Sequence, residues 1–272
     1  MSSVFRFFPV FAAVLCFAAA AQAQSKPGPR VAGKIELAAG ITQIEDKDKR
    51  TRRPAVGDNV FEGDAIATSR QSELHLNMAD GASLIVRENS RIRITEYVAD
   101  GGDKDRSLID LTRGALRSIT GWIGQYNRSN YRVRTPLVTI GVRGTDHEPT
   151  HLEAGDPRGA PGTYDKVNEG AAFMESKQGV VEVPANSAVF QALSAQGLPQ
   201  LLATIPAFFK PGSYEQQFLQ RAQELKNAIP QKRLERIDFL RRQGILPPEA
   251  QKALDQVKPL EEKGRELLRW LR

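Results

Sequence analysis

Apolar and polar residues alternate in short runs through the middle of the chain, between residues 31 and 191. A period of two places one set of side chains on a buried face and the other in water, which is typical of half-buried β-strands. The runs are 72–78, 84–86, 91–97, 107–111, 131–135, 138–140 and 179–183. We therefore predict a strand for each of them.

Dipeptides that favour turns separate these runs, among them Asp80-Gly81, Gly101-Gly102 and Arg113-Gly114. No segment of helical period interrupts the runs, so a parallel sheet with helical crossovers is not expected. The pattern predicts a mainly β domain over residues 31–191, built as a compact β-solenoid or a sandwich of short strands. The stretch 151–168, which is rich in Gly and Pro, is expected to form a long exposed loop.

The pattern changes in the last third of the chain. Residues 192–212 are apolar and contain proline, and we interpret them as a linker, whereas residues 213–272 have a helical period. Ser213 and Gln216 form a capping-box pattern at the start of this tail. Its first apolar stripe is Phe218, Leu219, Ala222, Leu225 and Ile229, and its later helices are expected to begin at Pro230, at Pro247-Pro248 and after Pro259.

Such short helices are marginal alone, so they are expected to pack on one another, on the β domain or on a partner. The tail also carries most of the positive charge. The whole chain has a formal net charge of +6, and from Ala207 onward 14 lysines and arginines stand against nine acidic residues. This basic helical tail is either a solvated surface or a docking surface for an anionic membrane or an acidic protein patch.

The N-terminus has the three parts of a secretory signal. Arg6 precedes an apolar stretch, 7–21, which is shorter than the about 20 residues of a membrane-spanning helix. Ala21 and Ala23 form a small-x-small cleavage motif. We expect residues 1–23 to be a signal peptide that is cleaved after Ala23, which leaves a periplasmic or secreted protein.

The residues that carry most enzyme and metal chemistry are scarce. Cys16 is the only cysteine and lies within the predicted signal, so disulfides and a thiol nucleophile are not expected in the mature chain. His75 lies in an alternating run, where a satisfied or surface role is expected. His147 and His151 are four residues apart after a predicted strand, a spacing of about 13 Å, which is too long for one metal ion. We predict no enzymatic activity, no cofactor and no metal.

Aromatic and basic residues interleave within 122–134, where Trp122, Tyr126 and Tyr131 stand among arginines. This composition is compatible with a nucleic-acid or glycan surface, and export argues against nucleic acid. A peptidoglycan- or glycan-binding envelope protein is therefore the alternative function that the sequence leaves open.

Several motifs occur in an order that resembles the FecR domain family, over about residues 57–190. They are the segments 63–68, 73–76 leading into 80–81, 88–92, 113–117, 132–136, 143–145 and 179–183. The residues that match the family pattern are Gly63, Asp64, Thr68, Asp80, Gly81, Gly114, Thr135, Pro136, Arg143, Gly144, Thr145 and Asp146. We interpret them as architectural: Gly144 permits a backbone conformation that a Cβ disfavours, and Arg143 is expected to bind turn carbonyls or a carboxylate such as Asp146.

The resemblance implies a periplasmic or extracellular β module, which in the namesake regulators relays a signal. Those regulators carry a cytoplasmic segment that acts on a sigma factor, followed by one membrane span. Because this chain has an export signal in that place, we expect no anti-sigma segment. We predict an exported, non-enzymatic interaction, scaffold or signalling module that binds another cell-envelope protein, with the basic tail also able to bind a glycan or an anionic membrane.

Overall fold

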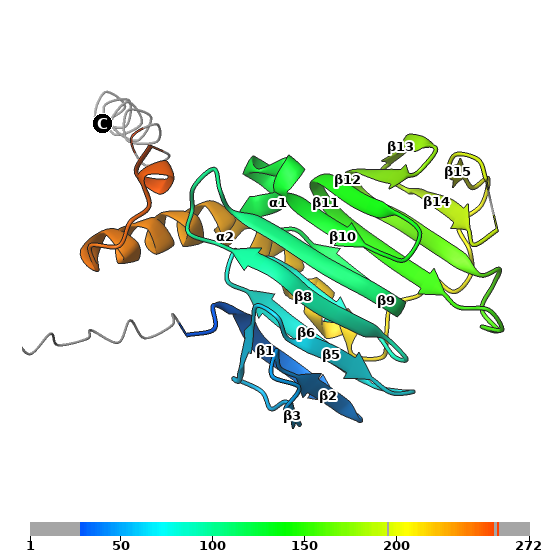
Figure 1. The fold of residues 1–272 in the computed structure, drawn as a ribbon, viewed down its shortest axis with the longest axis horizontal. Helices are drawn as coiled ribbons and strands as arrows, with labels where there is room; N and C mark the ends of the chain where they lie inside the picture. The colour runs from blue at the N-terminus through cyan, green and yellow to red at the C-terminus, as the bar shows by residue number, and fades with distance from the viewer. Residues whose placement is uncertain (1–27, 195, 253–254, 256–272) are drawn as a thin grey trace, which may run out of the picture.

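The computed structural model describes residues 28–194, 196–252 and 255. The predicted signal peptide, with Ala21 and Ala23, lies outside the described residues, as do Cys16 and the helix expected after Pro259. Strands dominate the described part of the chain, and the predicted mainly β fold is confirmed (Figure 1).

The strands are short at the N-terminal end and long in the middle of the chain. They are β1 Val31–Ala39, β2 Thr42–Glu45, β3 Thr51–Arg52, β4 Asn59–Phe61, β5 Ala65–Thr68, β6 Glu73–Met78, β7 Ser83–Val86, β8 Arg91–Val98, β9 Arg106–Ile119, β10 Tyr131–Arg134, β11 Thr139–Leu152, β12 Gly162–Ser176, β13 Gly179–Pro184, β14 Ser187–Ala192 and β15 Gln200–Leu201. The helices are α1 Trp122–Tyr126, a 3-10 turn at Arg128–Asn130, and α2 Glu215–Arg242.

Backbone pairing joins these strands into one sheet that folds into two layers. The first, which we call the open layer, has the strand order β3-β2-β5-β8-β9-β10-β11-β12-β13. The second, which we call the covered layer, has the order β4-β1-β6-β7-β9-β11-β12-β14-β15. Of the two architectures predicted, these pairings correspond to the sandwich.

Three long strands, β9, β11 and β12, contribute one half to each layer. Each changes layer at a glycine in the left-handed region: Gly114 at φ +85°, Gly144 at φ +59° and Gly170 at φ +79°. Only glycine adopts such angles without a steric penalty from a Cβ. Of these glycines, Gly114 belongs to a predicted turn and Gly144 to the family motif.

The main hydrophobic core lies between the two layers, because its residues come from both. Ile92 and Ile109 of the open layer belong to one buried cluster with Leu76 and Leu84 of the covered layer. Each of the four side chains is at most 2% exposed. Burial of such aliphatic side chains contributes about 1.5–3 kcal/mol each, so this core is the main source of stability.

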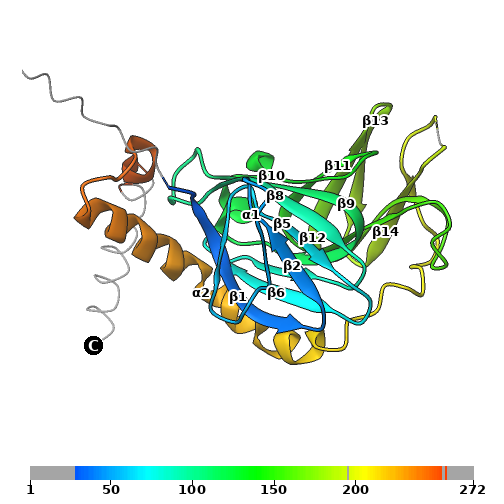
Figure 2. The ribbon, with the colours of Figure 1, turned by 60° about the horizontal axis from the view of Figure 1, so that its bottom comes forward.

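Helix α2 packs on the outer side of the covered layer and then continues past it (Figure 2). Phe218 is buried against Ile85 and Ile119, with Leu219 and Leu225 beside it. Farther along, Ile237 and Ala250 form a small cluster of their own against the glycines of the 101–102 turn. The described part of the tail is thus one body with the β domain. No helix among the described residues is long and apolar enough to cross a membrane.

The expected helix boundary at Pro230 is wrong, because α2 runs without a break through that residue. Proline normally interrupts a helix, since it lacks an N–H and its ring crowds the preceding turn. Here Ile229 and Ile237 are each 1% exposed, so packing on both sides of Pro230 keeps the two halves in one helix. A second helical stretch does resume at Pro248, as expected.

The predicted cap at Ser213 is also wrong. The N-cap residue is Tyr214, and it makes no side-chain cap hydrogen bond. Instead the Glu215 carboxylate accepts a hydrogen bond from the Gly212 N–H at 2.8 Å. A carboxylate in the first turn is favoured by the positive end of the helix dipole. Glu215, rather than Gln216, thus reaches back to an N–H three residues earlier.

The exposed loop expected at 151–168 is shorter than predicted and covers residues 153–161, because β11 extends to Leu152 and β12 begins at Gly162. The remaining residues of the stretch belong to the two strands, where Thr163 and Asp165 are fully buried and bonded inside the sandwich. Within the predicted linker 192–212, β15 pairs with β14. Phe209 of the same segment is buried against Tyr164.

Candidate functional site

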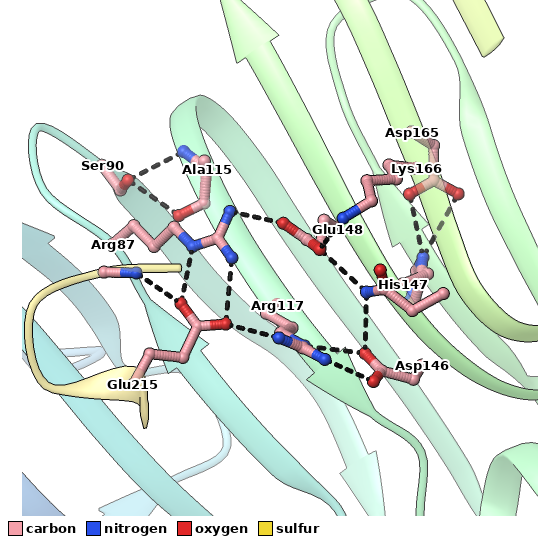
Figure 3. A network of polar contacts seen from close by, with 12 residues as sticks. Arg87, Ser90, Ala115, Arg117, Asp146, His147, Glu148, Asp165, Lys166 and Glu215 are labelled. Carbon is pink, nitrogen blue, oxygen red and sulfur yellow. Dashed lines mark hydrogen bonds and ion pairs between the residues drawn. The ribbon is translucent and has the colours of Figure 1, made fainter. Parts of the chain in front are cut away.

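The most concentrated group of charges is a buried network between the covered layer and the start of α2 (Figure 3). Arg87 follows β7, Arg117 lies on β9, Asp146 and Glu148 lie on β11, and Glu215 opens α2. All five side chains are at most 10% exposed. Charges removed from water in this way must be paired, or they oppose folding.

Glu215 stands at the centre of the network. Its carboxylate accepts hydrogen bonds from Arg87 at 3.0 and 3.1 Å and from Arg117 at 2.8 Å. Arg117 also forms a bidentate pair with Asp146, at 2.6 and 2.8 Å. Such fork-to-fork geometry fixes orientation as well as distance, so the network sets where α2 begins on the sheet.

Glu148 completes the network on its far side. Its carboxylate lies 2.7 Å from Arg87 and accepts hydrogen bonds from Asn168 at 2.8 Å and Lys166 at 3.0 Å. Burial alone would raise the pKa of Glu148. The positive charge of Arg87, with the contacts from Asn168 and Lys166, outweighs burial and lowers the pKa to about 2. Glu148 is therefore ionised at neutral pH.

Sequence reasoning missed this network. Asp146 was singled out, but as a partner of Arg143, whereas it binds Arg117. Arg87 and Glu215 are 128 residues apart, and no local spacing relates them. One feature of the sequence could have indicated the network. Arg117 is a charged residue of the motif segment 113–117 and lies in the half of β9 that is buried.

A second polar chain lies inside the sandwich and runs from Tyr131 of the open layer to residues of the covered layer. The Tyr131 hydroxyl lies 2.7 Å from Ser118 Oγ and 3.1 Å from His147 Nε2, while His147 Nδ1 lies 3.1 Å from Asp165. All four residues are at most 2% exposed. Burial raises the pKa of Asp165 and that of Tyr131.

This order of hydroxyl, imidazole and carboxylate resembles the groups of nucleophilic catalysis. A catalytic group must reach a substrate, and these side chains point into the core. The chain therefore satisfies polar groups within the sandwich. His151 is likewise occupied, with Nδ1 at 2.9 Å from Thr163 Oγ1. Within the described ranges, no three His, Cys, Asp or Glu side chains gather as a metal site.

His75, for which a satisfied or surface role was expected, lies 3.0 Å from Glu73 and edge-on to Phe218 of α2. It is only 2% exposed, so it belongs to the interface between the helix and the sheet rather than to the surface.

The first family-motif residues hold turns that lead from the covered layer to the open layer. Asp64 accepts hydrogen bonds from the Phe61 N–H at 3.1 Å and from Arg52 at 3.0 Å, and Gly63 beside it has φ +95°. Thr68 donates to the Arg87 carbonyl at 2.5 Å and accepts from the Ser90 N–H at 3.0 Å. These contacts pin β5 to the turn that follows β7.

Asp80 and Gly81 form the turn between β6 and β7. Asp80 Oδ1 accepts hydrogen bonds from the Tyr97 hydroxyl at 2.7 Å and from the Ala82 N–H at 3.1 Å. Burial raises the pKa of Asp80. Gly81 has φ +77° and lies under Ile229 of α2. This motif therefore joins the two layers and also supports the helix.

The later motif residues are divided between the core and the surface. Thr135 is buried and contacts Thr163, while Pro136 is exposed. Thr145 donates to the Ala171 carbonyl at 2.9 Å, next to the crossing at Gly144. The expected contact of Arg143 with Asp146 is wrong, because the Arg143 guanidinium is exposed and lies 5.2 Å over the Phe173 ring.

The aromatic residues expected to form a glycan surface are mostly inside the protein. Trp122 is 1% exposed and donates its indole N–H to Asp105 at 2.7 Å, and Tyr131 is 2% exposed. Tyr126 is exposed, but Arg233 of α2 lies 4.5 Å over its ring. The predicted stacking surface is therefore not present in this form.

The outer face of the open layer carries a groove of about 370 Å³ across β10, β11, β12 and β13. Gly141 occupies the middle of a row of cross-strand neighbours, between Arg132 and Phe173. Arg128 and Arg143 border the same groove, together with Glu175 and Val180. The apolar contacts of α2 are with the covered layer, whereas the 3-10 turn at Arg128–Asn130 borders this groove.

Comparison with known proteins agrees with the resemblance seen in the sequence. The model of the FecR protein family matches residues 64–158, a shorter span than that over which the motifs occur. The FecR resemblance is thereby confirmed for this segment. No curated protein gives a significant match.

Among solved structures, two crystal structures of a proposed anti-sigma factor from Parabacteroides distasonis ATCC 8503 are similar to this chain. Both are 13% identical, with TM-scores of 0.42 and 0.41, and cover 52% of this chain. The matched part spans 60% of that protein. A cell surface anchoring domain, 19% identical with a TM-score of 0.22, covers 23% of this chain and 82% of its own.

Proposed function

We propose that this chain is an exported, non-enzymatic module of the cell envelope that acts in signalling or scaffolding by binding another envelope protein. The proposal rests on a difference between the outer faces of the two layers. Helix α2 covers one outer face, whereas the other presents a charged β-sheet surface with a groove. We assign the partner to this face because it is left uncovered by α2 and carries the groove.

Two further observations support the proposal. The FecR match covers the centre of the sandwich, and a regulatory role in binding a partner is typical of such modules. The candidate acid, base and nucleophile side chains, such as His147 and Asp165, are committed to contacts inside the protein. The proposed export rests on the N-terminal signal pattern, 1–23.

The first test concerns location. The full-length chain is expressed in a bacterial host, and the protein released by osmotic shock is sequenced from its N-terminus. A first residue of Gln24 supports export with cleavage after Ala23. A protein that is retained in the cytoplasm and begins at Met1 contradicts it.

The second test concerns the binding surface. A photo-crosslinking residue replaces Glu182, an exposed residue of β13, or Glu224, an exposed residue of α2, in cells that express the full chain. We expect a discrete crosslinked protein from position 182 and none from position 224. Adducts from the helix position alone would assign partner binding to the other face, and the absence of adducts from both would contradict the proposed function.

A further inference from the structure

We propose that the groove around Gly141 binds an acidic peptide segment of the partner, with a partner carboxylate on Arg143 and Arg128 and an apolar side chain over Phe173 and Val180. This inference deepens the proposed function and rests on it. It predicts one kind of ligand for the groove of the open layer, a peptide that combines negative charge with an apolar group.

The charge at the groove carries the first step. Three arginines, Arg128, Arg132 and Arg143, line it, against the single carboxylate of Glu175. Glu175 lies 3.7 Å from Arg132. In the described part of the chain, neither Arg128 nor Arg143 has a carboxylate within ion-pair distance. Arg128 donates only its Nε, to the Gln125 carbonyl at 3.2 Å, so its terminal nitrogens and the Arg143 guanidinium remain to bind an anion. Arginine is the side chain best suited to a carboxylate.

The position of Arg143 is fixed by its neighbour. Its guanidinium carbon lies 5.2 Å from the centre of the Phe173 ring, which is within the range of a cation–π contact. A long side chain held over a ring loses less conformational freedom when it binds a ligand. Arg143 is therefore preorganised to receive an anion at the mouth of the groove.

The shape of the groove comes from Gly141. A Cβ built at this residue meets no atom within 4 Å, so the space above the strand is empty. Its φ is not in the left-handed region, so no feature of the backbone requires glycine here. The absence of a side chain opens a slot between Arg132 and Phe173, which are its cross-strand neighbours.

The apolar part of the groove selects a peptide rather than a simple anion. Val180 at the edge strand β13 is 56% exposed, and the Phe173 ring lies beside it under Arg143. Burial of an apolar side chain here adds to the ion pair. Glu182 of β13 is the cross-strand neighbour of Phe173. Its negative charge repels a carboxylate of the peptide, so we expect that carboxylate to bind on the Arg143 side.

The test uses the full mature chain and a fluorescent ten-residue peptide of alternating Glu and Phe. Fluorescence anisotropy is expected to show saturable binding, weakened about tenfold or more by Arg143→Glu and by Arg128→Glu, since each replaces an attraction by a repulsion. Arg53→Glu, at an exposed arginine of the 53–58 turn, is the matched control and is expected to leave binding unchanged.

Two further variants separate shape from charge. Gly141→Phe fills the slot without changing any charge and is expected to abolish binding, with an unchanged thermal unfolding curve. Glu175→Gln removes the only carboxylate of the groove and is expected to strengthen binding. A peptide with Gln in place of Glu should not bind.

Several outcomes would overturn the inference. These are no saturable binding of the Glu/Phe peptide, equal loss with Arg53→Glu, full binding by Gly141→Phe, or binding of soluble polygalacturonate in preference to the peptide, which would make the groove a site for anionic glycans. If the peptide fails to bind but position 182 still crosslinks to an envelope protein, the groove assignment fails while the proposed function stands.

Discussion

The carboxylate of Glu215 is bound by the guanidinium of Arg87 through two hydrogen bonds, of 3.0 and 3.1 Å, although the two residues are 128 positions apart in the chain. The Glu215 side chain is fully buried and that of Arg87 is 9% exposed. This contact ties the first turn of α2 to the turn after β7. The stability of the sandwich and the attachment of the helix to it therefore depend on each other.

Glu215→Gln tests this link. The change keeps the shape of the side chain but removes a negative charge between two buried guanidinium groups, Arg87 and Arg117. We expect the free energy of unfolding to fall by about 3 kcal/mol, because breaking a buried pair leaves uncompensated charge. Urea unfolding followed by circular dichroism measures it. Glu224→Gln, at an exposed position of the same helix, is the control, and an equal effect of both variants would contradict a special role of Glu215.

Glu148 gives a dependence of stability on pH. Its pKa in the folded protein is lowered to about 2, from an ordinary value of 4.5. A lowered folded-state pKa means that the unfolded chain binds the proton more tightly. The contribution of Glu148 is thus fully present above about pH 4.5 and is lost as the pH falls toward 2.

The matching measurement compares the wild type with Glu148→Gln at several pH values. Burial raises the pKa of other acids, such as Asp80 and Asp165, and these act in the opposite direction, so only the difference between the two proteins isolates Glu148. We expect a difference of about 3 kcal/mol at pH 7, which shrinks toward zero near pH 2. A difference independent of pH would refute the assignment.

The alternation of the sequence predicts the strands that have one wet face. The runs at 91–97 and 131–135 correspond to β8 and β10, whose burial alternates along the strand. The covered half of β11 does not alternate, because ion pairs with Arg87 and Arg117 bury Glu148 and Asp146 as well as its core-facing residues. Polar residues there, such as His147, have long-range partners, so their burial is not visible locally.

The motif glycines Gly114 and Gly144 lie where strands change layer, whereas the expected pair of Arg143 with Asp146 does not form. Arg143 and Asp146 are close in the sequence, yet the crossing at Gly144 sends them to opposite layers. Residues that are close in sequence on one strand normally lie in the same layer, but this no longer holds where the strand changes layer. The groove escaped prediction for a related reason, since it is made by residues of four strands around a glycine.

The inner polar chain predicts a cost for losing one hydroxyl. Tyr131→Phe removes the group that lies 2.7 Å from Ser118 Oγ and 3.1 Å from His147 Nε2. Both would be left buried without this partner, so we expect a loss of about 1–3 kcal/mol in the free energy of unfolding. Chemical denaturation measures it, with Tyr126→Phe at an exposed tyrosine as the control. Equal stability of the two variants would mean that the chain of contacts contributes nothing.

The layer crossing at Gly114 gives the last prediction, because two glycines of similar backbone conformation have different surroundings. Gly114 has φ +85° and Gly57 has φ +90°. A Cβ at Gly114 would overlap the Ser90 hydroxyl and the Ser90 backbone, whereas a Cβ at Gly57 meets nothing within 4 Å. Both alanine variants bear the left-handed penalty of about 1–2 kcal/mol, but only Gly114→Ala must also push two strands apart.

We therefore expect Gly57→Ala to fold with a loss of about 1 kcal/mol, and Gly114→Ala to lose at least about 3 kcal/mol or to accumulate as insoluble protein. Thermal unfolding of the soluble variants, with expression levels compared side by side, distinguishes them. A second variant, Ser90→Gly with Gly114→Ala, removes the side-chain part of the clash but leaves the overlap with the backbone at position 90, so partial recovery is expected. Equal losses for the two single variants would show that the sheet does not cross between layers at a tightly packed Gly114.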